Sequence, residues 1–241
     1  MWRCTSKIVK KKKVVEIGIV ILSRYSSSRF HGKALHIINK KTLIDHIVDN
    51  FKNILPEVKC VIATSTEKTD DIIWEHCKSK RIECFRGSLL NVSERVLKCS
   101  LNYKWNYFVR INGDNLFNDP NILSNVMNEI DITDFDFISN VQGRTFPYGI
   151  SIEIIKTSFY QKIIRNFYSD HHKEHVTSWL YENEEHGKRY TIKNKRFKNL
   201  AGVKLSIDTI KDVEIAKKII EFNGGENYVP LKVLDQFLIN K

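Results

Sequence analysis

A cluster of cationic and hydroxyl side chains directly follows an apolar run near the start of the chain. The run at 17–22 passes into SRYSSSRFHGK at 23–33. Arg24 and Arg29 carry planar guanidinium groups that suit phosphate oxygens, and Lys33 adds a compact positive charge. The serines can donate hydroxyl hydrogen bonds, and the glycine permits a backbone conformation that other residues rarely adopt. These residue types predict a loop that binds phosphate groups mainly through its side chains.

Two common glycine-rich phosphate loops do not fit this segment. A dinucleotide-binding fold would need G-x-G-x-x-G after the first strand, whereas Gly18 lies inside the apolar run and Gly32 stands alone. A P-loop would need G-x-x-x-x-G-K-[ST], whereas Ala34 follows Gly32 and Lys33. A solvated turn after a strand remains as the plain structural alternative, but the segment carries more cations than such a turn requires.

Two carboxylates lie where apolar segments end. Asp114 closes the stretch VRINGD, and Asp208 follows the stretch LSI directly before a predicted helix. A hard cation such as Mg²⁺ prefers oxygen ligands and is often held by one or two carboxylates together with substrate phosphates. Asp208 could instead cap the helix that follows it, which is a frequent role of aspartate. We favour the metal role because Asp114 provides a partner.

The elements that must position these residues alternate between apolar runs and amphipathic segments. Strands are predicted at 14–22, 58–63, 82–85, 106–111, 135–140, 152–155, 189–193 and 203–207. Helices are predicted at 42–54, 67–79, 91–101, 120–130, 156–167, 173–183, 209–222 and near 230–239. Thr42, Thr69 or Asp70, and Asp119 stand where helix N-caps are expected. The pattern predicts an α/β, Rossmann-like, mostly parallel sheet covered by helices, with ligands beyond the carboxyl ends of the strands.

The loop at 23–33 resembles the R-x-x-S-[ST]-R-x-x-G-K loop of the CMP-sugar synthetases, and more closely that of the spore-coat polysaccharide and acylneuraminate cytidylyltransferase group. In that family the loop grips the triphosphate of CTP. Further matches follow in the same order between about residues 15 and 222, namely VIATS, FRGS-x-x-NV-x-x-R, NGD, YGISIE, EHVT and LSIDT. The resemblance implies a fold of the nucleotide-diphospho-sugar transferase type and a CTP-dependent cytidylyltransferase that uses Mg²⁺.

The resemblance also implies roles for individual residues. Those expected to bind the nucleotide are Ser23, Arg24, Ser28, Arg29, Lys33, Thr64, Ser65, Arg86, Ser88 and Asn112. Those expected to act in catalysis are Arg24, Lys33, Asp114 and Asp208, the two aspartates as ligands of Mg²⁺. Those expected on the acceptor side are Ser151, Glu153 and His175. Arg95 ends the FRGS-x-x-NV-x-x-R match, a stretch that the resemblance implies to complete the nucleoside pocket, and an exposed helix position explains it about equally well.

The composition of the chain limits its domain organisation and its cellular location. The 241 residues carry a formal charge of +11, and six of the positive side chains lie in a basic leader at 1–13. The remainder, 14–241, is interpreted as one nucleotidyltransferase domain, because no linker divides it. Five cysteines without a C-x-x-C pair argue against a disulfide framework and favour a cytoplasmic protein. No apolar run is long enough to cross a bilayer.

Three functions remain open on the sequence. The first is transfer of CMP from CTP to an acidic sugar of the nonulosonic or 3-deoxy acid type, with release of pyrophosphate, for surface polysaccharide biosynthesis. The second is the same transfer to another acceptor, such as an amino sugar or a phosphonate, because fold-level likeness does not fix the acceptor. The third is a basic protein that binds nucleic acid, which is disfavoured because no recognised module is present. Family members commonly pair, so a homodimer is expected.

Overall fold

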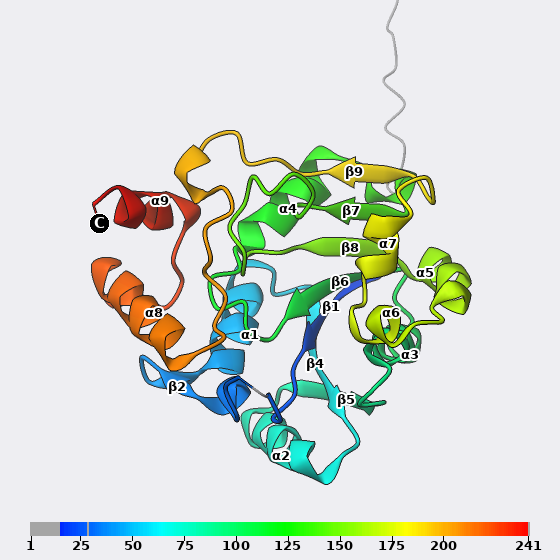
Figure 1. The fold of residues 1–241 in the computed structure, drawn as a ribbon, viewed down its shortest axis with the longest axis horizontal. Helices are drawn as coiled ribbons and strands as arrows, with labels where there is room; N and C mark the ends of the chain where they lie inside the picture. Colours follow the sequence, from blue (N-terminus) through cyan, green and yellow to red (C-terminus); the bar gives the residue numbers. More distant parts are fainter. Residues whose placement is uncertain (1–14, 28, 241) are drawn as a thin grey trace, which may run out of the picture.

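A central sheet carries the fold, as seen in a computed structural model that describes residues 15–27 and 29–240. The basic leader at 1–13 and Ser28 lie outside these residues. The strands are β1 (Ile17–Leu22), β4 (Lys59–Ser65), β5 (Glu83–Gly87), β6 (Tyr107–Asn112), β7 (Phe137–Ser139), β8 (Glu153–Lys156) and β9 (Arg189–Thr191). Their order is β5-β4-β1-β6-β8-β7-β9 (Figure 1). Only β8 runs antiparallel to its neighbours in this described sheet.

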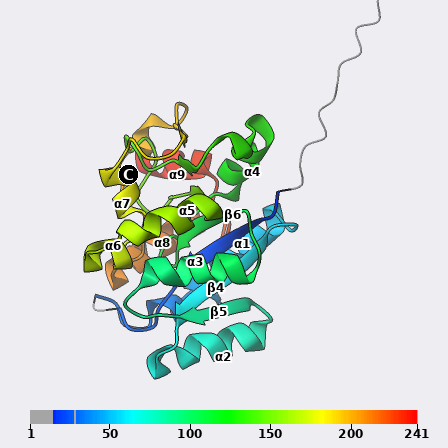
Figure 2. The same ribbon diagram turned by 90° about the vertical axis from the view of Figure 1, so that its right-hand side faces the viewer.

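Helices cover both faces of the sheet. They are α1 (Leu43–Ile54), α2 (Asp71–Lys80), α3 (Val92–Asn102), α4 (Pro120–Glu129), α5 (Thr157–Ile163), α6 (Asp170–Glu174), α7 (Ser178–Glu182), α8 (Ile210–Phe222) and α9 (Leu231–Ile239). Helices α1, α8 and α9 lie on one side of the sheet, and α3, α5, α6 and α7 lie on the other (Figures 1 and 2). The predicted mostly parallel sheet covered by helices is therefore confirmed.

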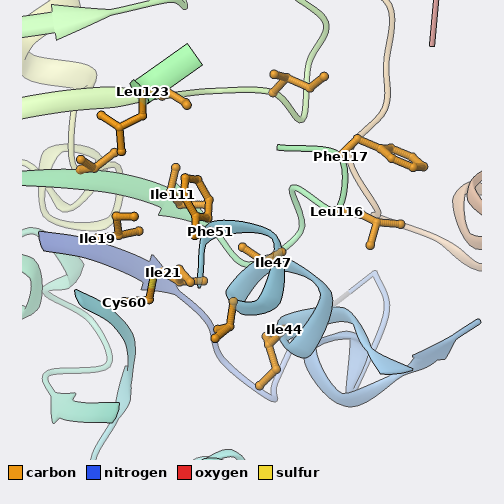
Figure 3. Packing of buried hydrophobic residues seen from close by; sticks show 14 of the residues in the cluster. Ile19, Ile21, Ile44, Ile47, Phe51, Cys60, Ile111, Leu116, Phe117 and Leu123 are labelled. Carbon is orange, nitrogen blue, oxygen red and sulfur yellow. The ribbon is translucent and has the colours of Figure 1, made fainter. Parts of the chain in front are cut away.

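Alternating strand residues build the two cores. Ile19 and Ile21 of β1 point to the cluster that contains α1, whereas Val20 between them points to the cluster that contains α3 and α5. Figure 3 shows the first core, in which Ile19 and Ile21 pack near Ile47 and Phe51 of α1. β1 is thus buried on both faces, as is typical of parallel sheets between two helical layers.

The connections of β1 determine where a ligand can bind. β1 pairs with β4 on one side and with β6 on the other. The chain therefore adds β4 and β5 on one side of β1 and then crosses over to place β6 on the opposite side. This reversal leaves a crevice beyond the carboxyl ends of β1 and β6, where ligands of open α/β sheets bind. The loop at 23–33 follows β1, and Gly113-Asp114 follows β6. Both predicted groups of functional residues therefore meet at one edge.

Several local predictions were wrong. Residues 203–207 form no strand, and only an isolated bridge joins Lys204 to Tyr148. The helix predicted at 173–183 is two short helices, α6 and α7, and the one predicted at 156–167 is α5 followed by a single 3-10 turn at Ile164–Asn166. A small hairpin of β2 (Ile37–Ile38) and β3 (Lys41–Thr42) was not predicted.

The helix N-caps were predicted with mixed success. The side chain of Thr42 accepts from the backbone of Asp45, and that of Asp119 accepts from Asn121, so both act as caps. Asp70 makes no capping bond. Asp208 does not cap α8 either, because Thr209 holds that position in a reciprocal bond with Asp212. The capping alternative for Asp208 is therefore wrong.

No helix among the described residues is long and apolar enough to cross a membrane.

Candidate active site

A cavity of about 250 Å³ opens at the carboxyl ends of β1 and β6. We call it the central cavity. Most of its polar wall comes from side chains of the loop, of β6 and of the helices on the α3 side. The lining residues include Ser23, Arg24, Ser27, Arg29, Lys33, Arg95, Arg110, Asn112, Asp114, Glu174 and His175. The sequence-predicted residues Ser23, Arg24, Arg29, Lys33, Asn112, Asp114 and His175 thus line one cavity.

Backbone contacts hold the cationic loop against the sheet. The amide of Ser23 donates to the carbonyl of Ala63 at 3.2 Å, which extends the β1–β4 pairing by one residue. Farther along, the amide of Gly32 donates to the carbonyl of Tyr25 at 2.9 Å. Gly32 has φ +70°, and a Cβ there would lie 3.2 Å from the ring of Tyr25. The loop therefore closes on itself at the position where glycine is needed.

Asp70 fastens the loop to the end of β4. This carboxylate is fully buried and accepts hydrogen bonds from the amide of Tyr25 at 2.7 Å and from the amide and hydroxyl of Ser65. Burial raises the pKa of Asp70, but these hydrogen bonds outweigh it and leave the pKa below its usual value. The carboxylate is thus ionised and links the loop, β4 and the start of α2.

Lys33 connects the two predicted carboxylates. Its Nζ lies 2.9 Å from Oδ2 of Asp114 and 3.5 Å from Oδ1 of Asp208. The backbone brings these side chains together, because the amide of Ile207 donates to the carbonyl of Asp114 at 2.9 Å. Glycine is required at position 113, because a Cβ there would lie 2.6 Å from the carbonyl oxygen of Leu22. Both carboxylates therefore lie within reach of a single cation.

The charge state of this group suits a hard metal ion. Burial raises the pKa of Asp208, but Lys33 and Arg29 outweigh it, so the pKa is lowered and the group is ionised. Two carboxylates next to cations that suit phosphates are the donor set that Mg²⁺ uses with a nucleotide. Among the described residues no cluster of three or more histidine, cysteine or acidic side chains is arranged to hold a metal. The remaining ligands of an ion would come from substrate and water.

The arginines of the loop pair with carboxylates across the central cavity. Arg29 lies 3.0 Å from Asp208, and Arg24 lies 3.0 Å from Glu174, the last residue of α6. Both arginine side chains are well exposed, so these pairs are weak and can exchange partners. A phosphate group entering the cavity would compete with the carboxylates for both guanidinium groups.

A second set of charged and polar side chains lies at and behind the β6 side of the cavity. Arg110 on β6 donates to Glu153 on β8 at 2.6 Å, and the Tyr181 hydroxyl donates to the other oxygen of Glu153 at 2.7 Å. Glu153 is only 1% exposed, so it lies behind Arg110 and not on the cavity wall. Ser151 is half-buried and is not among the lining residues. His175 lines the cavity, and burial together with His171 lowers its pKa.

Four of the residues expected at the nucleotide are not on the cavity wall. Thr64 and Ser65 are fully buried at the end of β4. The hydroxyl of Ser88 accepts from the amide of Asn91. Arg86 donates to the carbonyls of Ser65 and Glu67, so its guanidinium ties β5 to the loop after β4. These residues support the edge of the sheet in this structure.

Other lining residues were not assigned from the sequence. Arg110 lies inside an apolar strand, and the sequence gives no sign that it faces a cavity. Glu174 belongs to the EHVT match, but only the adjacent His175 was selected. Ser27 was noted as a hydroxyl donor without a role. For Arg95 the sequence left open a place in the nucleoside pocket or an exposed helix position, and the exposed position is wrong because the side chain is 2% exposed.

A cationic loop facing two carboxylates at the switch point of a parallel sheet defines a nucleotidyltransferase, and comparison with known proteins gives its family. The model of the cytidylyltransferase family matches residues 18–234. The chain belongs to this family and is a CTP-dependent enzyme.

Relatives and solved structures agree with this assignment. The chain is 30% identical over 221 residues to the spore coat polysaccharide biosynthesis protein SpsF of Bacillus subtilis, covering 87% of this chain and 88% of that protein. It is similar to the structure of a cytidylyltransferase from Leptospira borgpetersenii, with a TM-score of 0.82, 27% identity, and coverage of 94% of this chain and 93% of that one.

The fold alone is shared more widely. The structure of CMP:2-keto-3-deoxy-manno-octonic acid synthetase complexed with CTP matches with a TM-score of 0.62 at 13% identity, covering 86% of this chain and 98% of that one.

Proposed function

We propose that the enzyme transfers CMP from CTP to a hydroxyl group of an acidic sugar of the nonulosonic or 3-deoxy acid type, with release of pyrophosphate, in surface polysaccharide biosynthesis. The observation that carries the proposal is the position of Lys33 between Asp114 and Asp208, next to Arg24 and Arg29. This arrangement supplies carboxylates for a metal ion and cations for a triphosphate at one place.

The mechanism follows from charge and position. Asp114 and Asp208 would hold Mg²⁺, which supplies charge neutralisation at the reacting phosphate when bound. Arg24, Arg29 and Lys33 would hold the phosphates of the leaving pyrophosphate, where negative charge builds up. Such donors act by stabilising the transition state and by orienting the nucleotide, with little covalent chemistry required of the protein.

The acidic acceptor is supported by the charge of the central cavity and by the names of the relatives. Arg95 and Arg110 add two guanidinium groups to the wall beyond the loop, so a second anion would be attracted. SpsF is named for spore coat polysaccharide biosynthesis, and the CTP-bound structure is that of a synthetase for an eight-carbon 3-deoxy sugar acid. His175 lines the same cavity as Arg110 and is a candidate contact of the acceptor hydroxyl.

The test is a panel of nucleotides and acceptors with detection of released pyrophosphate. CTP, UTP, ATP and GTP are each combined with nonulosonic acids, 3-deoxy sugar acids, amino sugars and phosphonates, with and without Mg²⁺. We expect release with CTP, an acidic sugar and Mg²⁺, and none when any of the three is left out. Release with CTP and only an amino sugar or phosphonate would replace the acceptor proposed here. Unchanged release after Mg²⁺ is chelated would contradict the metal role.

A further inference from the structure

Arg95 is a buried cation on the wall of the central cavity. It lies in the first turns of α3 and is 2% exposed. Its Nη1 donates to the carbonyl of Ser88 at 2.7 Å, and its aliphatic part packs so closely over Gly87 that a Cβ there would lie 2.9 Å from Cγ of Arg95. The side chain is thus held in one orientation by the end of β5.

The other cations of this wall differ from Arg95 in having carboxylate partners. Arg24 pairs with Glu174, Arg29 with Asp208, Lys33 with Asp114, and Arg110 with Glu153. Within residues 15–27 and 29–240, Arg95 forms no ion pair, and its buried Nε has no hydrogen-bond partner. One backbone carbonyl is its polar contact in this part of the chain.

The electrostatic surroundings do not compensate the charge. Asp70 attracts Arg95 but makes no ion pair with it and already accepts from Tyr25 and Ser65, while Arg24 repels it. Burial is the main reason that the pKa of Arg95 falls to about 10, and the group stays charged at neutral pH. A buried charge without a counter-ion is costly for a fold. We therefore look for the use of this charge in the binding of a ligand and not in the stability of the fold without ligand.

We propose that Arg95 is a ligand-binding residue whose counter-ion is an anionic oxygen of the substrates in the central cavity, either a phosphate of CTP or the carboxylate of the acceptor. This inference rests on the proposed function. A guanidinium fixed at Ser88 before binding loses little side-chain freedom when the anion arrives, which makes it a well-organised anion site.

The experiment compares Arg95→Met, Arg95→Lys and the control Arg165→Met, which changes an exposed arginine away from the cavity. Melting temperature is measured without ligand, and CTP with Mg²⁺ is then titrated in the absence of acceptor. The KM of the acceptor is measured separately at saturating CTP. The first titration reports a phosphate contact and the second reports a contact with the acceptor carboxylate.

We expect Arg95→Met to melt at the same or a higher temperature than the native protein, because an uncompensated charge is removed. It should also weaken either CTP or the acceptor by roughly ten- to a hundredfold, as expected for a hydrogen bond to a charged group. Arg95→Lys should retain part of the affinity, and Arg165→Met should match the native protein in every measurement.

The inference is overturned if Arg95→Met binds CTP and acceptor like the native protein, since Arg95 would then only brace Ser88. If Arg95→Met fails to fold, Arg95→Lys decides, and native affinities for both ligands in that variant overturn the anion contact. Binding of CTP by the native protein can be measured without turnover. Failure of the pyrophosphate assay would therefore count against the proposed function and leave the CTP titration interpretable.

Discussion

Nη1 of Arg110 lies 2.6 Å from Oε2 of Glu153, directly across the antiparallel pairing of β6 and β8. Burial lowers the pKa of Arg110, but Glu153 outweighs it and the pKa is raised. Burial and the same glutamate raise the pKa of Tyr181, whose hydroxyl therefore stays a donor. Arg110 therefore lines the central cavity while the buried carboxylate of Glu153 neutralises its charge.

Removing Glu153 should destabilise the protein strongly. Glu153→Ala leaves Arg110 buried without its partner, which costs about 3–5 kcal/mol in comparable cases. The free energy of unfolding is measured by urea denaturation at pH 7. The double variant Arg110→Met/Glu153→Leu should recover most of the loss, because both charges are then absent. A loss below about 1 kcal/mol in the single variant would show that Arg110 finds another partner.

Asp114→Asn should abolish most activity while the fold survives. The substitution keeps the shape of the side chain but removes a charge proposed to hold Mg²⁺. We expect kcat to fall by about a hundredfold or more, as for the loss of one electrostatic contact to a transition state. Asp134→Asn, at an exposed position of the chain, is the control. Activity within threefold of the native enzyme would remove Asp114 from the metal site.

Lys33→Met should separate metal binding from catalysis. Lys33 occupies the space between the two carboxylates, so its charge competes with a metal ion there. Without nucleotide, Mn²⁺ as a spectroscopic substitute for Mg²⁺ should bind more tightly to the variant. The kcat/KM for CTP should nevertheless fall by about two orders of magnitude, since a cation for the phosphates is lost. Equal Mn²⁺ affinity in both proteins would contradict the competition.

Glu174→Gln should improve the binding of CTP slightly. Arg24 must leave Glu174 to contact a phosphate, and an exposed pair of this kind contributes at most about 1 kcal/mol. Release of Arg24 would therefore strengthen CTP binding by up to about fivefold. The affinity is measured by calorimetry at low salt, and the gain should shrink as salt is added. Weaker CTP binding in this variant would show that Glu174 helps the nucleotide.

The stabilising effect of Asp70 should disappear in acid. Its pKa is lowered in the folded protein, so the carboxylate contributes stability that is complete above its unfolded pKa of about 3.9 and is lost as the pH falls through the folded value. Asp70→Asn should be less stable than the native protein at pH 7, and the difference should shrink below pH 4. Urea denaturation between pH 7 and pH 3 measures this. A difference that stays constant over this range would assign the stability to shape alone.

The residues after β1 and β6 could be predicted because strand ends and their polar neighbours are adjacent in sequence. Asp208 came to the predicted place without the predicted strand, since the bond from Ile207 to Asp114 replaces regular pairing. The role of Arg86 was missed, because its partners are the carbonyls of Ser65 and Glu67 and the carboxylate of Asp71, all of which lie on the neighbouring β4–α2 connection. The pair of Arg110 and Glu153 was missed because β8 enters the sheet between β6 and β7, out of chain order.

The reversed direction of β8 also bears on how such enzymes diverge. β8 runs antiparallel to its neighbours β6 and β7, so it begins at the edge of the sheet where they end. The segment at 140–152, which precedes β8, therefore reaches this edge. It does not belong to the β1–β4–β5 half of the sheet that anchors the cationic loop. Insertions or exchanges in that segment can reshape one flank while the other keeps its architecture. Under the proposed function, changes in this segment would alter the side of the sheet on which the acceptor is expected and leave the loop that is expected to bind the nucleotide in place.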